Sequence, residues 1–131
     1  MVGVPTGRQR VLVVDDDQDT SEYLSVLLAD NGYEVRTAED AATALLQLEE
    51  FSADAVIMDV MMPGRSGLGL LVKLRSSPRW GDLRLIVITG NDHVLEDHGK
   101  SYLSSHGEVR GPDAVLGKPL NPEALLRVLE T

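Results

Sequence analysis

Short apolar runs, separated by segments with helical spacing, make up most of the chain. Two of the runs, residues 10–15 and 83–89, consist almost entirely of aliphatic and β-branched residues. That pattern is typical of strands covered on both faces. The predicted strands are residues 10–15, 33–38, 53–59, 83–89 and 113–116.

Four segments between and after these runs carry apolar residues at helical spacing. Leu24, Leu27 and Leu28 mark the apolar face of the first segment, and Leu71 and Leu74 mark that of the third. The predicted helices are residues 19–31, 40–48, 66–75 and 121–129.

Residues with capping side chains precede three of these helices. The first helix has two expected caps, Asp17 and Asp19. Asp19 is followed three residues later by an acid, as in a capping box. Asp40 is expected to cap the second helix. Asn121 and Pro122 supply the last helix with an N-cap and a first-turn proline.

The order of the elements favours an α/β domain with a parallel sheet. Strands that alternate with helices form parallel units, which place helices on both faces of the sheet. A length of 131 residues fits one such domain. We therefore expect a single domain over residues 9–131, preceded by a flexible arm over residues 1–8.

Residues 90–111 depart from this alternation because they are mostly polar. We expect one short helix near residues 94–104, followed by a glycine-rich loop. The segment holds the three histidines of the chain, His93, His98 and His106. Their spacing matches no compact zinc motif, and we interpret them as surface residues.

Composition and charge narrow the class of protein. Twelve basic residues stand against 21 acidic ones, giving a net charge of −9. This balance argues against binding to nucleic acid or an anionic membrane through a basic surface. The chain has no cysteine, which suits a reducing compartment, and no apolar run of membrane-spanning length. We expect a cytoplasmic protein.

Polar residues stand where the predicted strands end. Asp15 and Asp16 follow the first strand, Asp59 ends the third, Thr89 ends the fourth, and Lys118 follows the fifth. Parallel strands place their carboxyl ends at one edge of a sheet, where ligands of such folds bind. Singly, each residue has an ordinary structural explanation as a cap, a strand residue or a solvated lysine. Together at one edge, they indicate a site.

Three carboxylates at one edge need protons or a cation. Two of them about 5 Å apart repel by about 3 kcal/mol at an effective dielectric constant near 20. Hard carboxylate oxygens favour Mg²⁺, which often pairs with a phosphoryl group. A lysine and a hydroxyl nearby would neutralise phosphoryl oxygens. A carboxylate in such a site can itself be the nucleophile and form an acyl phosphate.

These residues resemble the receiver domains of two-component response regulators. Four stretches carry the resemblance, in order and over residues 10–131: VLVVDDDQD, DAVIMDVMMPGRSG, VITGND and LGKPLNPEAL. The resemblance implies a flavodoxin-like fold, with one doubly wound five-stranded parallel sheet of order 2-1-3-4-5.

The resemblance also implies a metal site. Asp59 is implied to be the phosphoacceptor and a ligand of Mg²⁺. Asp16 would bind the metal directly with the assistance of Asp15, and Met61 would offer its backbone carbonyl.

Two further residues are implied to act on the phosphoryl group. Lys118 would contact its oxygens, and the bond from Lys118 to Pro119 is expected to be cis. Thr89 would move inward to bind the phosphoryl group, which is the switch of the family.

The sequence departs from the family in two places. Val115 stands where an aromatic residue usually accompanies the threonine in the switch. The interval from Thr89 to Lys118 is several residues longer than usual, so the segment around the fourth helix is atypical. Phosphoryl chemistry is expected to be intact, whereas signal transmission is expected to take a different route.

Three functions from different classes remain open. The favoured one is a signalling switch that catalyses its own phosphotransfer and autodephosphorylation, and is not otherwise an enzyme. Its partners would be a sensor histidine kinase or phosphotransfer protein and a downstream protein, with a homodimer possible and nucleic acid and membrane excluded. The second is a pseudo-receiver, an interaction module that is not phosphorylated. The third, an aspartyl phosphatase, is weakest because Met61 stands where such enzymes need an acid.

Overall fold

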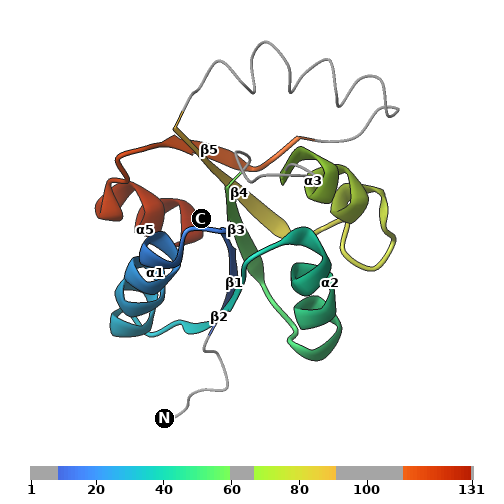
Figure 1. Cartoon of the computed structure of the whole chain (residues 1–131), viewed down its shortest axis with the longest axis horizontal. Helices are drawn as coiled ribbons and strands as arrows, with labels where there is room; N and C mark the ends of the chain where they lie inside the picture. The colour runs from blue at the N-terminus through green and yellow to red at the C-terminus, as the bar shows by residue number, and fades with distance from the viewer. Residues whose placement is uncertain (1–8, 60–66, 91–110, 131) are drawn as a thin grey trace.

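The computed structural model describes residues 9–59, 67–90 and 111–130, which form a five-stranded sheet and four helices (Figure 1). The strands are β1 (Arg10–Val14), β2 (Glu34–Ala38), β3 (Ala55–Asp59), β4 (Arg84–Thr89) and β5 (Ala114–Gly117). The helices are α1 (Gln18–Asp30), α2 (Ala41–Glu50), α3 (Gly67–Ser76) and α5 (Pro122–Glu130).

The sheet is parallel throughout and has the order β2-β1-β3-β4-β5. This result confirms the fold class expected from the sequence. The first strand has the second on one side and the third on the other, so the order reverses at β1. The carboxyl ends of the strands lie along one edge of the sheet, which we call the carboxyl edge, and their amino ends form the opposite amino edge.

Helices cover both faces of the sheet (Figure 1). On one face, α1 and α5 bury Leu24 and Leu125 against the odd-numbered side chains of β1 and β3. On the other face, α2 and α3 bury Leu48 and Leu71 against the even-numbered side chains of the same strands. The central strands are apolar on both faces because each face is covered.

Side-chain caps begin three of the helices. Helix α1 is capped by Asp17, whose carboxylate accepts a hydrogen bond from the backbone N–H of Asp19. Asp19 therefore lies inside the helix, one residue after its start, and the prediction that it caps α1 is wrong. Asp40 caps α2 by accepting from Thr43 N–H, and Asn121 accepts from the N–H groups of the first turn of α5, as predicted.

Several predictions concern residues outside the described part of the chain. They are the flexible arm over residues 1–8, the helix near 94–104, the three surface histidines and the role of Met61. Among the helices that the structure describes, none is both long enough and apolar enough to cross a membrane.

Candidate functional site

Asp59 is the last residue of β3 and lies at the carboxyl edge. All five residues of β3 are buried, and Asp59 itself is 5% exposed. The strand is held between β1 and β4, and its apolar side chains enter both cores. The packing of the strand therefore fixes the position of this carboxylate.

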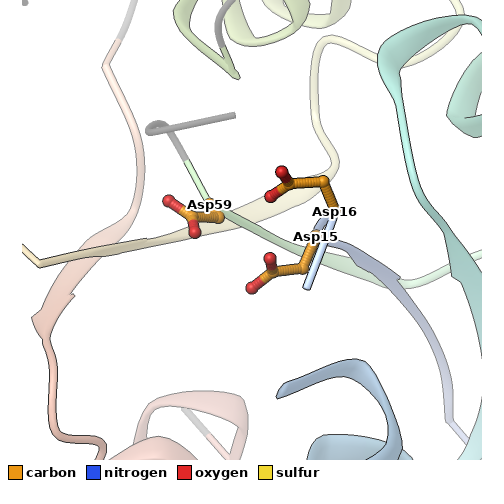
Figure 2. A group of neighbouring side chains, drawn as sticks. All are labelled: Asp15, Asp16 and Asp59. Atoms are coloured by element: carbon orange, nitrogen blue, oxygen red, sulfur yellow. The ribbon is translucent and has the colours of Figure 1, made fainter. Parts of the chain in front are cut away.

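Asp15 and Asp16 follow directly after β1, beside Asp59. The backbone N–H of Asp15 donates to Ala38 O, and its Oδ1 accepts from the N–H of Asp17 at 2.9 Å. Ligand oxygens of Asp15, Asp16 and Asp59 all lie within 4.8 Å of one another. Figure 2 shows the three carboxylates, which we call the acidic cluster, side by side at the ends of two neighbouring strands. Asp15 and Asp59 are buried, whereas Asp16 is exposed to solvent.

Lys118 brings a positive charge to the acidic cluster. Its Nζ donates a hydrogen bond of 3.0 Å to Oδ2 of Asp59 and lies 3.9 Å from Oδ2 of Asp15. Its backbone N–H donates to Thr89 O, which ties the end of β5 to the end of β4. Lys118 and Pro119 are joined by a cis peptide bond, as expected.

Among the described residues, one basic side chain, Lys118, faces the three acids of this site. Oδ2 of Asp15 has no hydrogen-bond partner among the described residues, although it is buried. Burial is the main cause that raises the pKa of Asp15, and the nearby carboxylate of Asp59 adds to the shift. Burial alone would lower the pKa of Lys118, but the hydrogen bond and charge of Asp59 outweigh it, and the pKa is raised.

The acidic cluster has the donor set of a site for a hard divalent cation. Carboxylate oxygens are the preferred ligands of Mg²⁺, which keeps several waters when it binds to proteins. Oδ2 of Asp15, which accepts no hydrogen bond from the described residues, and the exposed carboxylate of Asp16 would supply ligands without breaking a hydrogen bond that the structure shows. The residues present therefore fit this group.

Thr89 ends β4 and is fully buried at the carboxyl edge. The structure thus brings five of the six predicted site residues to that edge, and the sixth, Met61, lies outside the described residues. Val115, the departure noted in the sequence, is 45% exposed on β5.

Arg75, at the end of α3, has a buried side chain that was not predicted from the sequence. Its guanidinium donates four hydrogen bonds, to Gly81 O, Leu83 O, Gly111 O and Asp113 Oδ2. The signal in the sequence is its position four residues after Leu71, on the apolar stripe of the helix.

Residues 11–130 match the family model described as "Response regulator receiver domain". Over 117 residues, 89% of this chain, the sequence is 40% identical to response regulator MprA from Mycobacterium sp. strain KMS and 39% identical to MprA from Mycobacterium avium strain 104. The match covers 47% of each relative, so the chain spans about half of their length.

Solved structures agree with the sequence relatives. The chemotaxis response regulator CheY4 of Vibrio cholerae is 29% identical, with a TM-score of 0.78 and coverage of 94% of this chain and 97% of that chain. Response regulator TrrA of Thermotoga maritima, solved in complex with Mg²⁺ and BeF, is 30% identical, with a TM-score of 0.77 and coverage of 93% and 96%.

Proposed function

The chain belongs to the response regulator receiver domain family, and we propose that it acts as a phosphorylation-controlled switch in two-component signalling. The phosphoryl group would come from the phosphohistidine of a sensor histidine kinase or of a phosphotransfer protein. The acceptor would be Asp59. A downstream protein partner would respond to the change, in the cytoplasm and without direct contact of this domain with nucleic acid.

The transfer is a nucleophilic displacement at phosphorus. An Oδ of Asp59 forms the new P–O bond, the P–N bond to the imidazole of the donor breaks, and the imidazole nitrogen takes up the electron pair. Asp59 suits this role because the buried strand β3 holds it in place at the carboxyl edge, with Lys118 hydrogen-bonded to its carboxylate.

Three carboxylates would hold the metal on which the transfer depends. Asp16 would bind Mg²⁺ directly, with Asp15, Asp59 and the backbone carbonyl of Met61 completing the protein ligands. When bound, Mg²⁺ supplies charge neutralisation to the phosphoryl oxygens. The TrrA structure in complex with Mg²⁺ and BeF supports this assignment, because TrrA is similar to this chain over almost its whole length.

Lys118 and Thr89 would act on the opposite side of the phosphoryl group. The Nζ of Lys118 already lies 3.0 Å from the acceptor carboxylate, within reach of a group attached to it. Thr89 stands beside Lys118 at the end of the neighbouring strand and would donate its hydroxyl to the phosphoryl group. The resulting rearrangement would alter the surface around β4 and β5, which a downstream partner or a second copy of the chain would contact.

The observation that carries the proposal is the hydrogen bond between Lys118 and Asp59 inside a cluster of three acids. The test is incubation with Mg²⁺ and acetyl phosphate, followed by intact-mass analysis. We expect one hydroxylamine-labile phosphoryl group per chain, absent in Asp59→Asn and in EDTA. Asp82→Asn, which changes an exposed acid near the amino edge, is the matched control and should label normally.

Failure to label separates the alternatives. A wild-type protein that takes no phosphoryl group from acetyl phosphate or from a cognate kinase would be the pseudo-receiver, an interaction module that is not phosphorylated. Labelling that persists in Asp59→Asn would remove Asp59 from the role of acceptor.

A further inference from the structure

The position of Lys118 depends on β5, the strand directly before it. The sequence of β5 only weakly specifies how the strand is aligned with β4. It is four residues long, it reads Ala-Val-Leu-Gly, and among the described strands it pairs only with β4. Register in a sheet is normally set by which side chains must face the core. Here the residues on both sides of the strand are apolar or glycine, so a shifted strand would still present apolar side chains to the core.

In β5 the difference in burial between the two faces of the strand is small. Ala114 and Leu116 pack against the core beneath α1 and α5, but neither is fully buried. Val115, which points to the other side, is 45% exposed. A slip of one residue would exchange these sets and put Val115 toward the core, at a modest loss of apolar contact. Something other than hydrophobic patterning must hold the observed register.

Asp113, immediately before β5, makes contacts that are specific to one register. Its Oδ2 accepts a hydrogen bond of 2.8 Å from the backbone N–H of Leu85, near the start of β4. Its own N–H donates to Leu85 O, also at 2.8 Å. Both contacts join the same two residues, so they can form only when Asp113 lies opposite Leu85.

Arg75 holds the Asp113 carboxylate in place from α3. Its Nη2 donates to Asp113 Oδ2 at 2.8 Å, and its Nε donates to Gly111 O at 3.2 Å. The rest of the guanidinium is anchored to the loop before β4, through Gly81 O and Leu83 O. The side chain of Arg75 is 1% exposed and that of Asp113 is 37% exposed, so the guanidinium is shielded from water while the carboxylate is partly solvated. Charge-assisted hydrogen bonds from a shielded guanidinium are strong.

We propose that Arg75 and Asp113 are positioning residues that set the register of β5 and thereby place Lys118 against Asp59. Asp113 directly precedes β5, and Lys118 directly follows it at the other end. A slip of one residue would move it by about 3.3 Å along the strand and turn its side chain to the other face. Its 3.0 Å hydrogen bond to Asp59 would not survive either change.

The register can be measured without any phosphorylation. The chain has three lysines, so protein labelled with ¹⁵N-lysine gives three backbone amide signals. The amide of Lys118 donates to Thr89 O, a bond that exists only in the observed register, so we expect it to be protected from hydrogen exchange. The amide of Lys73, within α3, reports the stability of the whole domain.

In Arg75→Gln and in the milder Asp113→Asn, we expect the Lys118 amide to exchange about tenfold faster than in the wild type, relative to the Lys73 amide. Arg79→Gln and Asp82→Asn are the controls and should leave this ratio unchanged. If both amides speed up equally in folded Asp113→Asn, the pair is only structural and the proposal is wrong. The same conclusion follows if neither amide changes.

The second readout is the rate of phosphorylation by acetyl phosphate, and it rests on the function proposed above. Because Arg75 is proposed to act through Lys118, Asp113→Asn should slow labelling in the wild-type background and have no further effect in Lys118→Ala. Equal slowing in both backgrounds would contradict the proposal. A protein that never labels would refute the proposed function, while the amide ratio would still test the register.

Discussion

Two ion pairs lie at opposite ends of β5 and differ in how fully their polar atoms are satisfied. Arg75 and Asp113 meet at 2.8 Å near the amino edge, and Lys118 and Asp59 meet at 3.0 Å at the carboxyl edge. The guanidinium of the first pair makes four hydrogen bonds. The second pair leaves the neighbouring oxygen of Asp15 without a hydrogen bond among the described residues.

This difference separates a structural pair from a binding site. Buried polar groups are normally hydrogen-bonded, and a buried network stabilises a fold only when its members are satisfied. The amino-edge pair meets that condition with protein atoms alone. Among the described residues, the carboxyl-edge site sets three carboxylates against one lysine, and Oδ2 of Asp15 accepts no hydrogen bond. A surplus of carboxylate charge is typical of a site that takes a cation from solvent.

Removing the satisfied pair should have the largest effect on stability. Arg75→Ala removes the cation beside the Asp113 carboxylate and the donor to three backbone carbonyls. We expect a loss of about 2–4 kcal/mol, less than for a fully buried pair, because the side chain of Asp113 is 37% exposed. Urea unfolding followed by the fluorescence of Trp80, the one tryptophan of the chain, measures the loss. A loss below 1 kcal/mol would show that solvent replaces these bonds and that the two ends of β5 do not differ as described.

Removing a charge from the acidic cluster should raise the stability of the protein when no Mg²⁺ is present. Asp15→Asn keeps an oxygen to accept the Asp17 N–H but removes a charge that is desolvated and repelled by Asp59. Without Mg²⁺ at neutral pH, we expect the variant to be more stable than the wild type by about 1–3 kcal/mol, the usual cost of a buried unsatisfied group. The same urea titration measures this gain. In saturating Mg²⁺ the order should reverse, because the metal stabilises only a folded state that binds it.

The pH dependence of this gain follows from the raised pKa of Asp15. A carboxyl whose pKa is higher in the folded protein than its ordinary value of 3.8 stabilises the fold in its protonated form. That contribution is fully present below 3.8 and is lost as the pH rises through the raised pKa. The advantage of Asp15→Asn should therefore shrink on acidification toward pH 4. An advantage independent of pH would assign the effect to packing.

The smallest effect is expected at an exposed pair. Arg79 and Glu49 meet at 2.7 Å, but both side chains are more than half exposed. Arg79→Gln should therefore destabilise the protein by ~0.2–1 kcal/mol, and by less at high salt. A loss as large as that of Arg75→Ala would mean that burial does not distinguish the pairs.

The strands and helices were predictable from the sequence because the spacing of apolar residues determines where they form. All five strands and four described helices appear where apolar spacing placed them, with boundaries shifted by one or two residues. The convergence of Asp15, Asp59 and Lys118 was predictable because parallel strands end at one edge. The sequence offered both Asp17 and Asp19 as caps of α1, because nearby acids have equal capping propensity and only the backbone conformation decides between them; the structure uses Asp17.

Contacts between distant side chains were not predictable in the same way. Arg75 and Asp113 are 38 residues apart, and nothing local in either segment indicates that they meet. An arginine on an apolar helix stripe signals a buried partner, but the sequence does not say which acid supplies it. The spare oxygen of Asp15 is likewise a result of packing, since it depends on how far Lys118 reaches.

The comparison of the two ends of β5 rests on the proposal that the acidic cluster binds a divalent cation. Calorimetric titration with Mg²⁺ tests it most directly. We predict one Mg²⁺ per chain, with affinity lost or strongly reduced in Asp15→Asn, Asp16→Asn and Asp59→Asn, and unchanged in the control Asp82→Asn. Binding that is equal in all five proteins, or absent from the wild type, would contradict the account.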